Sequence, residues 1–344
     1  MNKQKPTMLI TGGAGFIGSN FIHYFLKNYP DSQLLNIDKL TYAGTMENLR
    51  EIESLNNYHF IQGDITDEIL INNIFNEYDI EGIIHFAAES HVDRSIIDAR
   101  EFIQSNVLGT MILLQTAKAH WEEKDVLSER RFHQISTDEV YGSLEETGKF
   151  NENTPYDPRN PYSASKAGAN MLAKSFGSTY GMNIVISSSS NNYGPRQHEE
   201  KLIPTIISKA LSRESIPIYG DGKNIRDWLY VEDHCRAIDL IYHQANPLET
   251  YNIGGGNEKA NIEIATEICE ILDQLEPDLR KRSSLDSFKD LITFTEDRLG
   301  HDRRYAVDDT KLKNELGWKP VEQLESGLKK TVEWYVNQWK IPTL

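Results

Sequence analysis

The sequence predicts an α/β protein in which a doubly wound parallel sheet is followed by a smaller mixed α/β domain at the C-terminal side. Three observations predict this fold. The first half of the chain alternates short apolar runs with helical patterns, the apolar runs are continuous, and a glycine-rich turn links the first run to a helix. Continuous apolar strands that alternate with helices are typical of a parallel sheet covered on both faces.

The predicted elements of the first half follow one another at short intervals. Strands are expected at 7–11, 33–38, 59–64, 82–88, 131–136 and 183–191, and helices at 16–28, 67–77, 100–120 and 161–181. After Gly194 the pattern loosens, and short strands interleave with helices near 202–212, 232–245, 261–275 and 323–338. We expect a first domain formed by residues 1–194 with parts of 221–253, and a second domain formed by residues 195–220 and 254–340.

The composition limits the partners and the compartment. The formal net charge is −16, from 52 acidic and 36 basic residues, and such a field repels nucleic acid and anionic membrane surfaces. Cys235 and Cys269 are the two cysteines, and they show neither a disulfide framework nor metal-type spacing. The N-terminal segment lacks the apolar region of a signal peptide, and no apolar run approaches the roughly 20 residues of a membrane span. We expect a cytoplasmic enzyme that acts on a small molecule and has no metal site.

The glycine-rich turn predicts a dinucleotide site. Gly12, Gly15 and Gly18 lie directly after the first strand, in TGGAGFIG, where they let the backbone approach a pyrophosphate at a helix N-terminus. Asp38 ends the second strand, where a carboxylate accepts hydrogen bonds from the adenosine ribose and disfavours a 2′-phosphate. A plain tight turn and a helix-capping Asp are the alternatives for these residues taken singly. Their joint spacing favours a Rossmann-type domain that binds NAD.

Two further groups of residues predict proton transfer. Tyr162 and Lys166 share one face of a helix in PYSASK, and an ammonium beside a phenol lowers the pKa of the phenol. Such a pair takes a proton from an alcohol while a hydride leaves it. Thr137, Asp138 and Glu139 follow the strand 131–136, and two carboxylates held close together tend to keep one proton between them. The alternative for the acid pair is a loop pair that caps a neighbouring helix.

These motifs together resemble the extended short-chain dehydrogenase/reductase family. The resemblance is carried by TGGAGFIG, HFAAESHVDRS, STDEVYG, PYSASKAG and NNYGPRQ, and with PIYGDGKNIRDWLYVEDH and GHDRRYAVD it covers nearly the whole chain. Within the family, an acid pair after the catalytic Thr resembles the branch that removes water from nucleotide sugars. The family usually has Pro where this chain has Leu299. We expect this Leu to affect the rigidity of its loop and not its role.

The resemblance implies roles for a wider set of residues. The residues expected to bind NAD are Gly12, Gly15, Phe16, Ile17, Gly18, Asp38, Lys39, Leu40, Thr41, Asp64, Ile65, Phe86, Ala87, Ala88, Glu89, Ser90, Ser105, Tyr162, Lys166 and Asn192. The residues expected to bind the sugar nucleotide are Ser90, Thr137, Asn191, Lys201, Leu202, Pro217, Ile218, Tyr219, Arg226, Asn261, Arg298 and His301. The positively charged side chains among them would bind the negative diphosphate in an otherwise acidic protein.

The predicted chemistry is the removal of water from a nucleotide-linked hexose. Oxidation at C4 acidifies the hydrogen at C5, so that Glu139 can remove it while a protonated Asp138 assists the departure of the C6 hydroxyl. The resemblance implies dTDP-glucose as substrate, dTDP-4-dehydro-6-deoxy-glucose as product, deoxysugar biosynthesis, for example of dTDP-rhamnose, as the pathway, and a homodimer formed through helices 100–120 and 161–181.

Three alternatives stay open at this point. A nucleotide-sugar 4-epimerase needs the Tyr162/Lys166 pair and a Thr, but leaves Asp138 and Glu139 without a use. A non-catalytic NAD-sensing protein has no use for a tuned phenol. A CDP- or UDP-linked glucose would need much of the same pocket as the dTDP-linked one.

Overall fold

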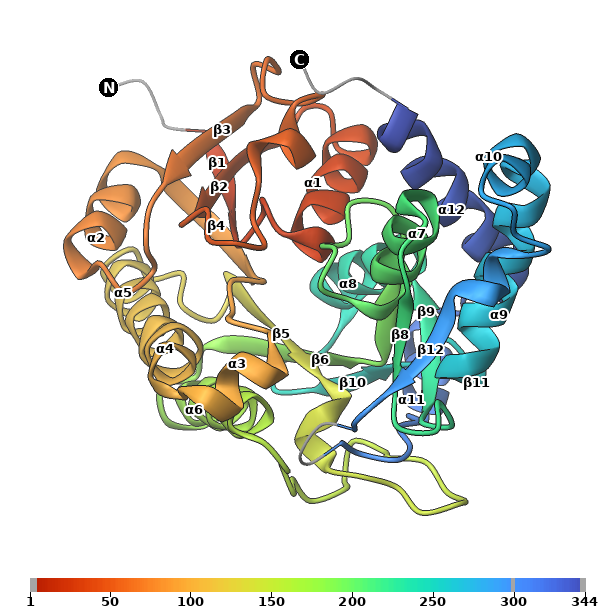
Figure 1. Ribbon diagram of the computed structural model, residues 1–344. Coiled ribbons are helices and arrows are strands. Elements are labelled where there is room, and N and C mark those ends of the chain that lie inside the picture. Colours follow the sequence, from red (N-terminus) through yellow and green to blue (C-terminus); the bar gives the residue numbers. More distant parts are fainter. Residues whose placement is uncertain (1–4, 298–300, 341–344) are drawn as a thin grey trace.

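The computed structural model describes residues 5–297 and 301–340 and has a seven-stranded parallel sheet at its centre (Figure 1). The strand order is β10-β6-β5-β4-β1-β2-β3. This arrangement is doubly wound, because the chain adds β2 and β3 on one side of β1 and then β4, β5, β6 and β10 on the other. The strands are β1 (Pro6–Thr11), β2 (Gln33–Asp38), β3 (Tyr58–Gln62), β4 (Asp79–His85), β5 (Arg131–Thr137), β6 (Asn183–Ser189) and β10 (Thr250–Ile253). This sheet confirms the predicted α/β fold class.

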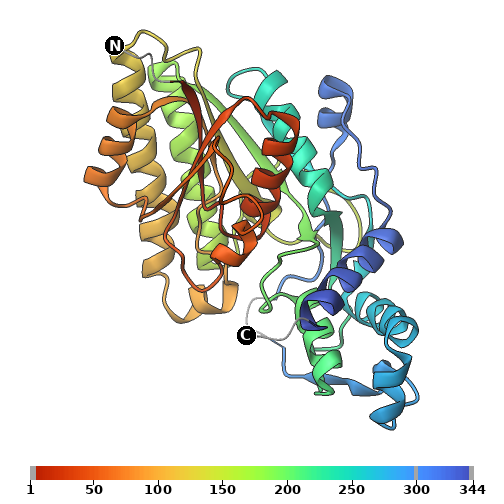
Figure 2. The same cartoon turned by 90° about the horizontal axis from the view of Figure 1, so that it is seen from above.

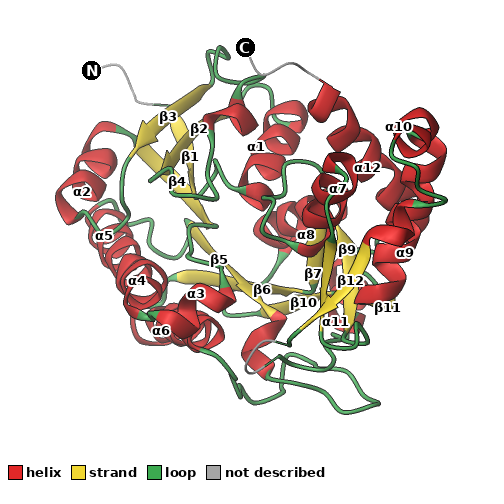
Figure 3. Cartoon of the chain, in the orientation of Figure 1, coloured by secondary structure: helices red, strands yellow, loops and turns green. Residues whose placement is uncertain are grey.

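Helices cover both faces of this sheet, as Figure 3 shows by the red helices on either side of the yellow strands. One face carries α1 (Phe16–Asn28) and α8 (Val231–Gln244), whose side chains form a core with Ile10, Leu34 and Ile84. The other face carries α2 (Glu68–Glu77), α5 (Thr110–Glu123) and α6 (Pro161–Tyr180), packed on strand residues such as Leu9 and Leu35. Burial on both faces explains why the strands are continuously apolar.

The segment before α5 departs from a plain helix. The sequence predicts one helix over 100–120, whereas the chain forms α3 (Val92–Ile97), α4 (Arg100–Phe102) and a π-helical stretch, η2 (Ile103–Gly109), which runs into α5. A π-helical turn inside a helix is rare and frequently occurs at functional sites. Here it carries Ser105 and Asn106 toward the loop after β4.

The smaller region has its own core. It contains β8 (Ile216–Tyr219) paired with β12 (Ile292–Thr295), and a three-stranded sheet of β11 (Glu258–Ala260), β9 (Ile225–Tyr230) and β7 (Asn191–Tyr193). Its helices are α7 (Leu202–Ser212), α9 (Asn261–Leu275), α10 (Pro277–Arg282) and α12 (Leu324–Lys340). In Figure 2 these green and blue segments gather beside the larger sheet-and-helix body. The helices α7, α9 and α12 share one cluster of buried side chains with β8 and β9.

Two short segments link the smaller region to the larger one. The helix α11 (Thr310–Leu316) packs on β10 and α8 through Leu312, and Trp318 just after the helix joins the same cluster, so part of the 254–340 range lies against the first core. Residues 303–308 also bond to the loop after β5, where Leu144 N donates to the Arg304 carbonyl and Phe150 N donates to the Ala306 carbonyl. The predicted domain boundaries stay a prediction.

Among the described residues there are also three short 3-10 helices: η1 (Met46–Leu49), η3 (Asp138–Tyr141) and η4 (Phe288–Leu291). In the two described stretches of the chain, no helix is long and apolar enough to cross a membrane. The η3 turn is the one that matters for the site, since it contains the predicted acid pair.

Candidate active site

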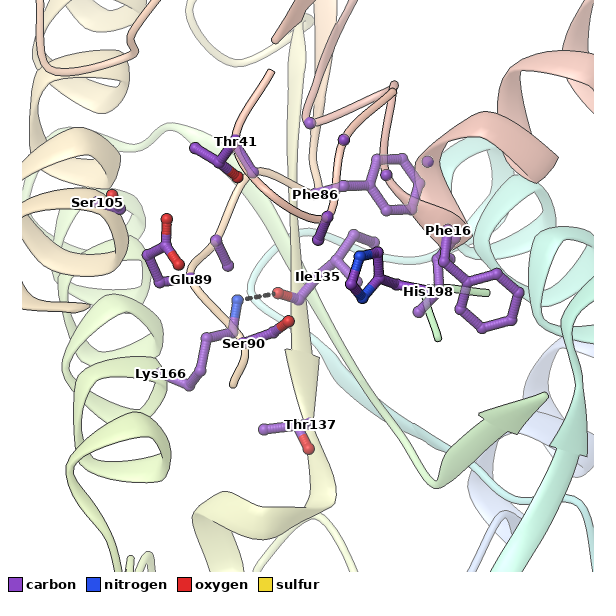
Figure 4. Close-up of a pocket in the computed structure, with 18 of the residues that line it drawn as sticks. Phe16, Thr41, Phe86, Glu89, Ser90, Ser105, Ile135, Thr137, Lys166 and His198 are labelled. Atoms are coloured by element: carbon purple, nitrogen blue, oxygen red, sulfur yellow. Dashed lines mark hydrogen bonds between the residues drawn. The ribbon is translucent and has the colours of Figure 1, made fainter. Parts of the chain in front are cut away.

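A cavity of about 320 Å³ runs along the carboxyl ends of the central strands. This is the edge at which doubly wound sheets bind their ligands. The predicted residues that line it are Gly12, Gly15, Phe16, Ile17, Gly18, Asp38, Lys39, Thr41, Asp64, Ile65, Phe86, Ala87, Ala88, Glu89, Ser90, Ser105, Thr137, Asp138, Glu139, Tyr162, Lys166, Asn191, Asn192 and Lys201. Figure 4 shows part of this lining, with Thr41 at the top, Phe16 and His198 at the right and Thr137 at the bottom of the view.

The glycine turn after β1 leaves no room for side chains, so that its backbone can lie close to a ligand. Gly12 has a φ of +73°, and a Cβ there would lie 2.5 Å from the backbone nitrogen of Ala87. A Cβ on Gly18 would lie 2.4 Å from the Gly12 carbonyl oxygen. Gly15 precedes α1 without a side-chain cap, so the first N–H groups of this helix stay available to a ligand. These features fit the pyrophosphate of a dinucleotide.

The acids after β2 and β3 form the adenosine end of the cavity. Asp38 accepts hydrogen bonds from Ala14 N and Leu40 N, both at 2.8 Å, which fixes its carboxylate at the strand end. Lys39 Nζ lies 2.7 Å from Asp64 Oδ2, so these two loops are joined across the cavity. Leu40 adopts a φ of +56° and packs its side chain on the core beneath α1. Its backbone, and not its side chain, therefore belongs to this end of the site.

The loop after β4 is held by a buried asparagine. Asn106 Oδ1 accepts from Glu89 N at 2.8 Å, and its Nδ2 donates to the Glu89 carbonyl at 3.0 Å and to Ser165 Oγ at 2.8 Å. Burial raises the pKa of Glu89. The π-helical stretch that carries Asn106 thus fixes the loop 86–90 against α6, the helix of Tyr162 and Lys166.

The tyrosine and lysine predicted to act together are both buried at the start of α6. Asn160 caps this helix by accepting from Ser163 N at 2.8 Å, and Pro161 occupies its first turn. Lys166 Nζ donates to the Ile135 carbonyl at 2.7 Å, as the dashed line in Figure 4 shows. Burial lowers the pKa of Lys166 to about 8.

The predicted lowering of the tyrosine pKa is wrong, because the surroundings of Tyr162 act in the opposite direction. Burial raises the pKa of Tyr162, and the nearby Glu139 and Asp138 carboxylates raise it further. The hydroxyl of Thr137 acts in the opposite direction. Lys166 Nζ donates to the Ile135 carbonyl instead of to the phenol.

The acid pair lies at the end of β5. The hydroxyl of Thr137 accepts from Glu139 N at 3.3 Å, which starts the η3 turn and points both acids toward the cavity lining. Asp138 is 2% exposed, and burial raises its pKa well above its ordinary range, with Glu139 as the second cause. A buried neutral carboxyl can donate a proton. Tyr141 packs on Phe150 and donates to Asn252 Oδ1 at 2.9 Å, away from the chemistry.

Sequence reasoning missed part of the lining. The additional residues are Ile37, Ala43, Gly44, Gly63, Ile135, Ser136, Ser189, Ser190, Gln197, His198 and Glu200. The segment 194–201 folds over the cavity, and its Glu200 lies 3.5 Å from His91 Nε2 and 3.2 Å from Lys201 Nζ. The dense polar run after Tyr193 was the signal that could have placed this segment in the site.

The remaining predicted substrate residues lie in the smaller region, beyond the lining of this cavity. Tyr219 and His301 face each other with ring centroids 6.3 Å apart. Ile218 is 1% exposed and packs in the core, because side chains alternate along β8, so Pro217 and Tyr219 alone face outward. Leu202 and Asn261 begin α7 and α9. Arg298 and Leu299 lie outside the described residues.

Arg226 lies on β9 in the smaller region and is buried. Its guanidinium lies 4.5 Å from the ring centroid of Tyr305, and its Nη2 donates to the Asp302 carbonyl at 2.9 Å. Tyr305 also donates to the carboxylate of Asp302. The charge of Arg226 lowers the pKa of Asp138, which places this cation close to the acid pair.

Comparison with known proteins identifies the family. Residues 9–331 match the family model described as GDP-mannose 4,6 dehydratase. The chain is 50% identical to a probable dTDP-glucose 4,6-dehydratase of Sinorhizobium fredii, over 96% of this chain and 93% of that protein. It is also 50% identical to the dTDP-glucose 4,6-dehydratase of Neisseria gonorrhoeae, over 97% of this chain and 96% of that protein. The chain belongs to the dTDP-glucose 4,6-dehydratase family.

Solved structures of this family superpose closely on the chain. A dTDP-glucose 4,6-dehydratase from Bacillus anthracis in complex with NAD has 42% identity and a TM-score of 0.84, covering 96% of this chain and 97% of that chain. One from Streptomyces venezuelae, with NAD and TYD bound, has 40% identity and a TM-score of 0.85, covering 97% and 98%. A UDP-glucose 4-epimerase from Thermotoga maritima shares the fold at a TM-score of 0.83 but only 28% identity, covering 97% and 100%. The dTDP-glucose 4,6-dehydratase family is therefore nearer to this chain than that epimerase.

Proposed function

We propose that the protein is an NAD-dependent hydro-lyase that converts dTDP-glucose into dTDP-4-dehydro-6-deoxy-glucose. The observation that carries this proposal is the meeting of two groups in one cavity. Asp138 and Glu139 lie beside Tyr162 and Thr137, at the same sheet edge as the glycine turn. Oxidation alone would use Tyr162 and Thr137. The acid pair adds the means to remove water.

The residues that would hold NAD follow the strand ends. The turn around Gly12 and Gly15 would take the pyrophosphate, Asp38 the adenosine ribose, and the loop 86–90 the nicotinamide half. When bound, NAD accepts a hydride from C4 of the sugar and later returns it to C6. The carboxylate of Asp38 selects against a 2′-phosphate by charge repulsion.

Tyr162 would act first. Its side chain lies beside the hydroxyl of Thr137 and, as the phenolate, would take the proton of the C4 hydroxyl as this carbon becomes a ketone. Lys166 would orient the nicotinamide ribose, and its low pKa, about 8, lets it share in proton movement near neutral pH. Thr137 would donate to the new C4 oxygen.

The acid pair would then remove water. The C4 ketone acidifies the C5 hydrogen, and Glu139 takes this proton while the C6–O bond breaks. Asp138 gives its proton to the departing oxygen, which leaves as water. After the hydride has returned to C6, the proton on Glu139 goes back to C5, and Asp138 regains a proton before the next turnover. Opposite roles for adjacent acids follow from their different burial.

The smaller region would hold the nucleotide. Lys201, in the cavity lining, and Arg226 would supply the cations for the diphosphate, and the perpendicular rings of Tyr219 and His301 would offer a surface on which the thymine can pack. The dTDP-glucose 4,6-dehydratase of Streptomyces venezuelae was crystallised with TYD. These cations would offset the repulsion between a dianionic substrate and a protein of net charge −16.

We also propose a pathway, a compartment and an oligomeric state for the enzyme. A 4-keto-6-deoxy sugar nucleotide is a step toward deoxysugars such as rhamnose, in the cytoplasm. A homodimer would form through the helical segment 100–120 and through α6. Several large apolar side chains are exposed on this side: Met171 is 60% exposed, Ile103 51% and Leu108 40%. Such a patch on neighbouring helices is typical of a subunit interface.

A substrate panel tests the proposed function. The protein with NAD is given dTDP-, UDP-, CDP- and GDP-glucose, and the products are identified by mass spectrometry and NMR. We expect a 4-keto-6-deoxy product, formed fastest from dTDP-glucose. A product that differs only in the configuration at C4 would make the protein an epimerase. Bound NAD without any product would make it a sensor.

A further inference from the structure

Asp227 is a buried carboxylate that the proposed reaction does not use. It lies on β9, is 2% exposed, and belongs to neither the cavity lining nor the predicted residues. Its Oδ2 accepts from Gly255 N at 3.0 Å, and its Oδ1 accepts from Asn257 N at 2.8 Å. Two backbone N–H groups of one glycine turn thus fix this side chain and favour its charged form.

The strand registers place Asp227 beside the acid pair. Thr137 at the end of β5 is paired with Ser189 of β6, and Asn191 of β7 is paired with Trp228 of β9. Continuing both registers by one residue puts Ser190 between Asp138 and Asp227. Ser190 is 3% exposed and lines the cavity. Both carboxyl groups are buried, the charge of Asp227 raises the pKa of Asp138, and the hydroxyl of Ser190 lowers the pKa of Asp227, so the three side chains lie near one another.

The hydrogen bonds of the two carboxyl groups differ. Asp138 accepts one long bond, from Thr137 Oγ1 at 3.4 Å, and its Oδ2 is buried without a hydrogen-bond partner in the described part of the chain. Asp227 has two N–H donors. Burial raises the pKa of both groups, but that of Asp138 rises well above its ordinary range. When the two carboxyl groups hold one proton, Asp138 therefore carries it and Asp227 is charged.

We propose that Asp227 is a positioning residue, whose fixed negative charge beside Ser190 holds the proton on Asp138 until the C6 oxygen departs. The inference rests on the proposed function, because it assigns Asp138 as the acid of that reaction. The step is a proton transfer alone. Asp138 loses its proton to the C6 oxygen as the C6–O bond breaks, and Asp227 keeps its charge throughout.

Several charged and titratable groups face Asp138 from the elements around it. They are Glu139 on η3, Asp227 and Arg226 on β9, and Tyr162 on α6. Glu139 is the base that takes the C5 proton, so it loses its negative charge during the reaction. Arg226 acts against protonation. Asp227 is the remaining charge that favours the protonated acid and stays constant through the cycle.

Neutralising Asp227 tests the inference. Asp227→Asn keeps the size of the side chain and removes the charge, so Asp138 should lose its proton at lower pH. We expect the alkaline limb of the kcat profile to move down by about one pH unit or more. C4 oxidation, followed in a single turnover by the absorbance of reduced nicotinamide, should keep its rate. An unshifted alkaline limb in the folded variant would overturn the inference.

The matched control is Asp233→Asn. Asp233 is 1% exposed, and its Oδ2 accepts from Val321 N at 3.0 Å and Glu322 N at 2.9 Å, so it loses the same kind of bonds. It lies on α8 and pairs with Arg236. A structural effect should lower the melting temperature in both variants. Only Asp227→Asn should move the pH limb, and an equal shift in Asp233→Asn would contradict the inference.

A second measurement works even if Asp227→Asn does not fold. Infrared spectra of the wild-type enzyme with bound NAD should show the carbonyl band of a buried protonated carboxyl at neutral pH, and Asp138→Asn should lack it. If that band is absent from the wild type, the inference is wrong. Failure of the proposed function looks different, because the wild type would then give no 4-keto-6-deoxy product at all.

Discussion

The cofactor side and the sugar-nucleotide side of the molecule are built in different ways. On the cofactor side, most candidate residues lie at or just after the strand ends of one parallel sheet, from Gly12 after β1 to Thr137 at the end of β5, and Tyr162 and Lys166 lie on α6 beside them. On the other side, Tyr219, Arg226 and His301 come from two small sheets and a connecting loop. One sheet edge fixes the first group internally, whereas the second depends on how the smaller core sits against the larger. We therefore expect substitutions on the two sides to change different kinetic constants.

The largest effect is expected at Tyr162. Tyr162→Phe removes the hydroxyl that takes the C4 proton, so the first chemical step should slow by about 10²–10⁴-fold with little change in KM. Formation of reduced nicotinamide in a single turnover measures this step. Tyr141→Phe is the control, since it removes a buried hydroxyl that bonds to Asn252 at 2.9 Å. Normal nicotinamide reduction in Tyr162→Phe would break the assignment of this side.

A cofactor-side backbone change comes next. Gly18→Ala would place a Cβ 2.4 Å from the Gly12 carbonyl, so the turn has to shift away from the pyrophosphate site. We expect NAD binding, measured by calorimetry, to weaken by at least about tenfold, roughly 1.4 kcal/mol. Gly168→Ala is the control, because its Cβ would meet only the Val107 side chain, at 3.5 Å. Equal NAD affinity in both variants would contradict the pyrophosphate assignment.

On the sugar-nucleotide side, Arg226→Met sharpens the contrast. Loss of a charged partner for the diphosphate should raise KM by about tenfold or more, while NAD binding stays unchanged. Steady-state kinetics and calorimetry separate the two. The control is Arg303→Met, which breaks an exposed pair with Asp221 at 2.9 Å and should be nearly silent. A loss of NAD affinity in Arg226→Met would mean that the two sides are not independent.

The smallest effect on chemistry is expected at the proposed interface between subunits. Met171→Asp puts a charge on the exposed face of α6, so the protein should shift toward monomer in analytical ultracentrifugation. Ile69→Asp, at a side chain that is 75% exposed on α2, is the control and should leave the assembly unchanged. An unaltered mass for Met171→Asp would move the interface elsewhere.

The sequence predicts the cofactor side in detail for a physical reason. A strand end, a glycine turn and a helix start are local, so TGGAGFIG and Asp38 carry their own geometry. The position of Tyr162 and Lys166 likewise follows from one helix and its Asn160 cap. The fold class was confirmed because buried parallel strands have a continuous apolar pattern.

What the sequence could not predict depends on contacts between distant segments. Gln197, His198 and Glu200 line the cavity because the segment after β7 folds back over it. The side chain of Ile218 faces the core because α7 and α9 pack on that face of β8, and α9 lies far along the chain. The raised pKa of Tyr162 follows from burial and from Glu139, neither of which the helical spacing contains. Asp227 was missed because its closeness to Asp138 depends on two strand pairings, of β5 with β6 and of β7 with β9, which belong to different sheets.

The central claim is that the acid pair turns a sugar oxidation into removal of water, and Glu139→Gln tests it most directly. With NAD and dTDP-glucose, this variant should reduce the nicotinamide at a near-normal rate and then stop, with the reduced cofactor and the C4 ketone bound and hexose C6 still hydroxylated. Glu152→Gln, which alters a carboxylate bonded to Asn252 N at 2.8 Å, should complete the reaction. Normal formation of the 4-keto-6-deoxy product by Glu139→Gln would contradict the account.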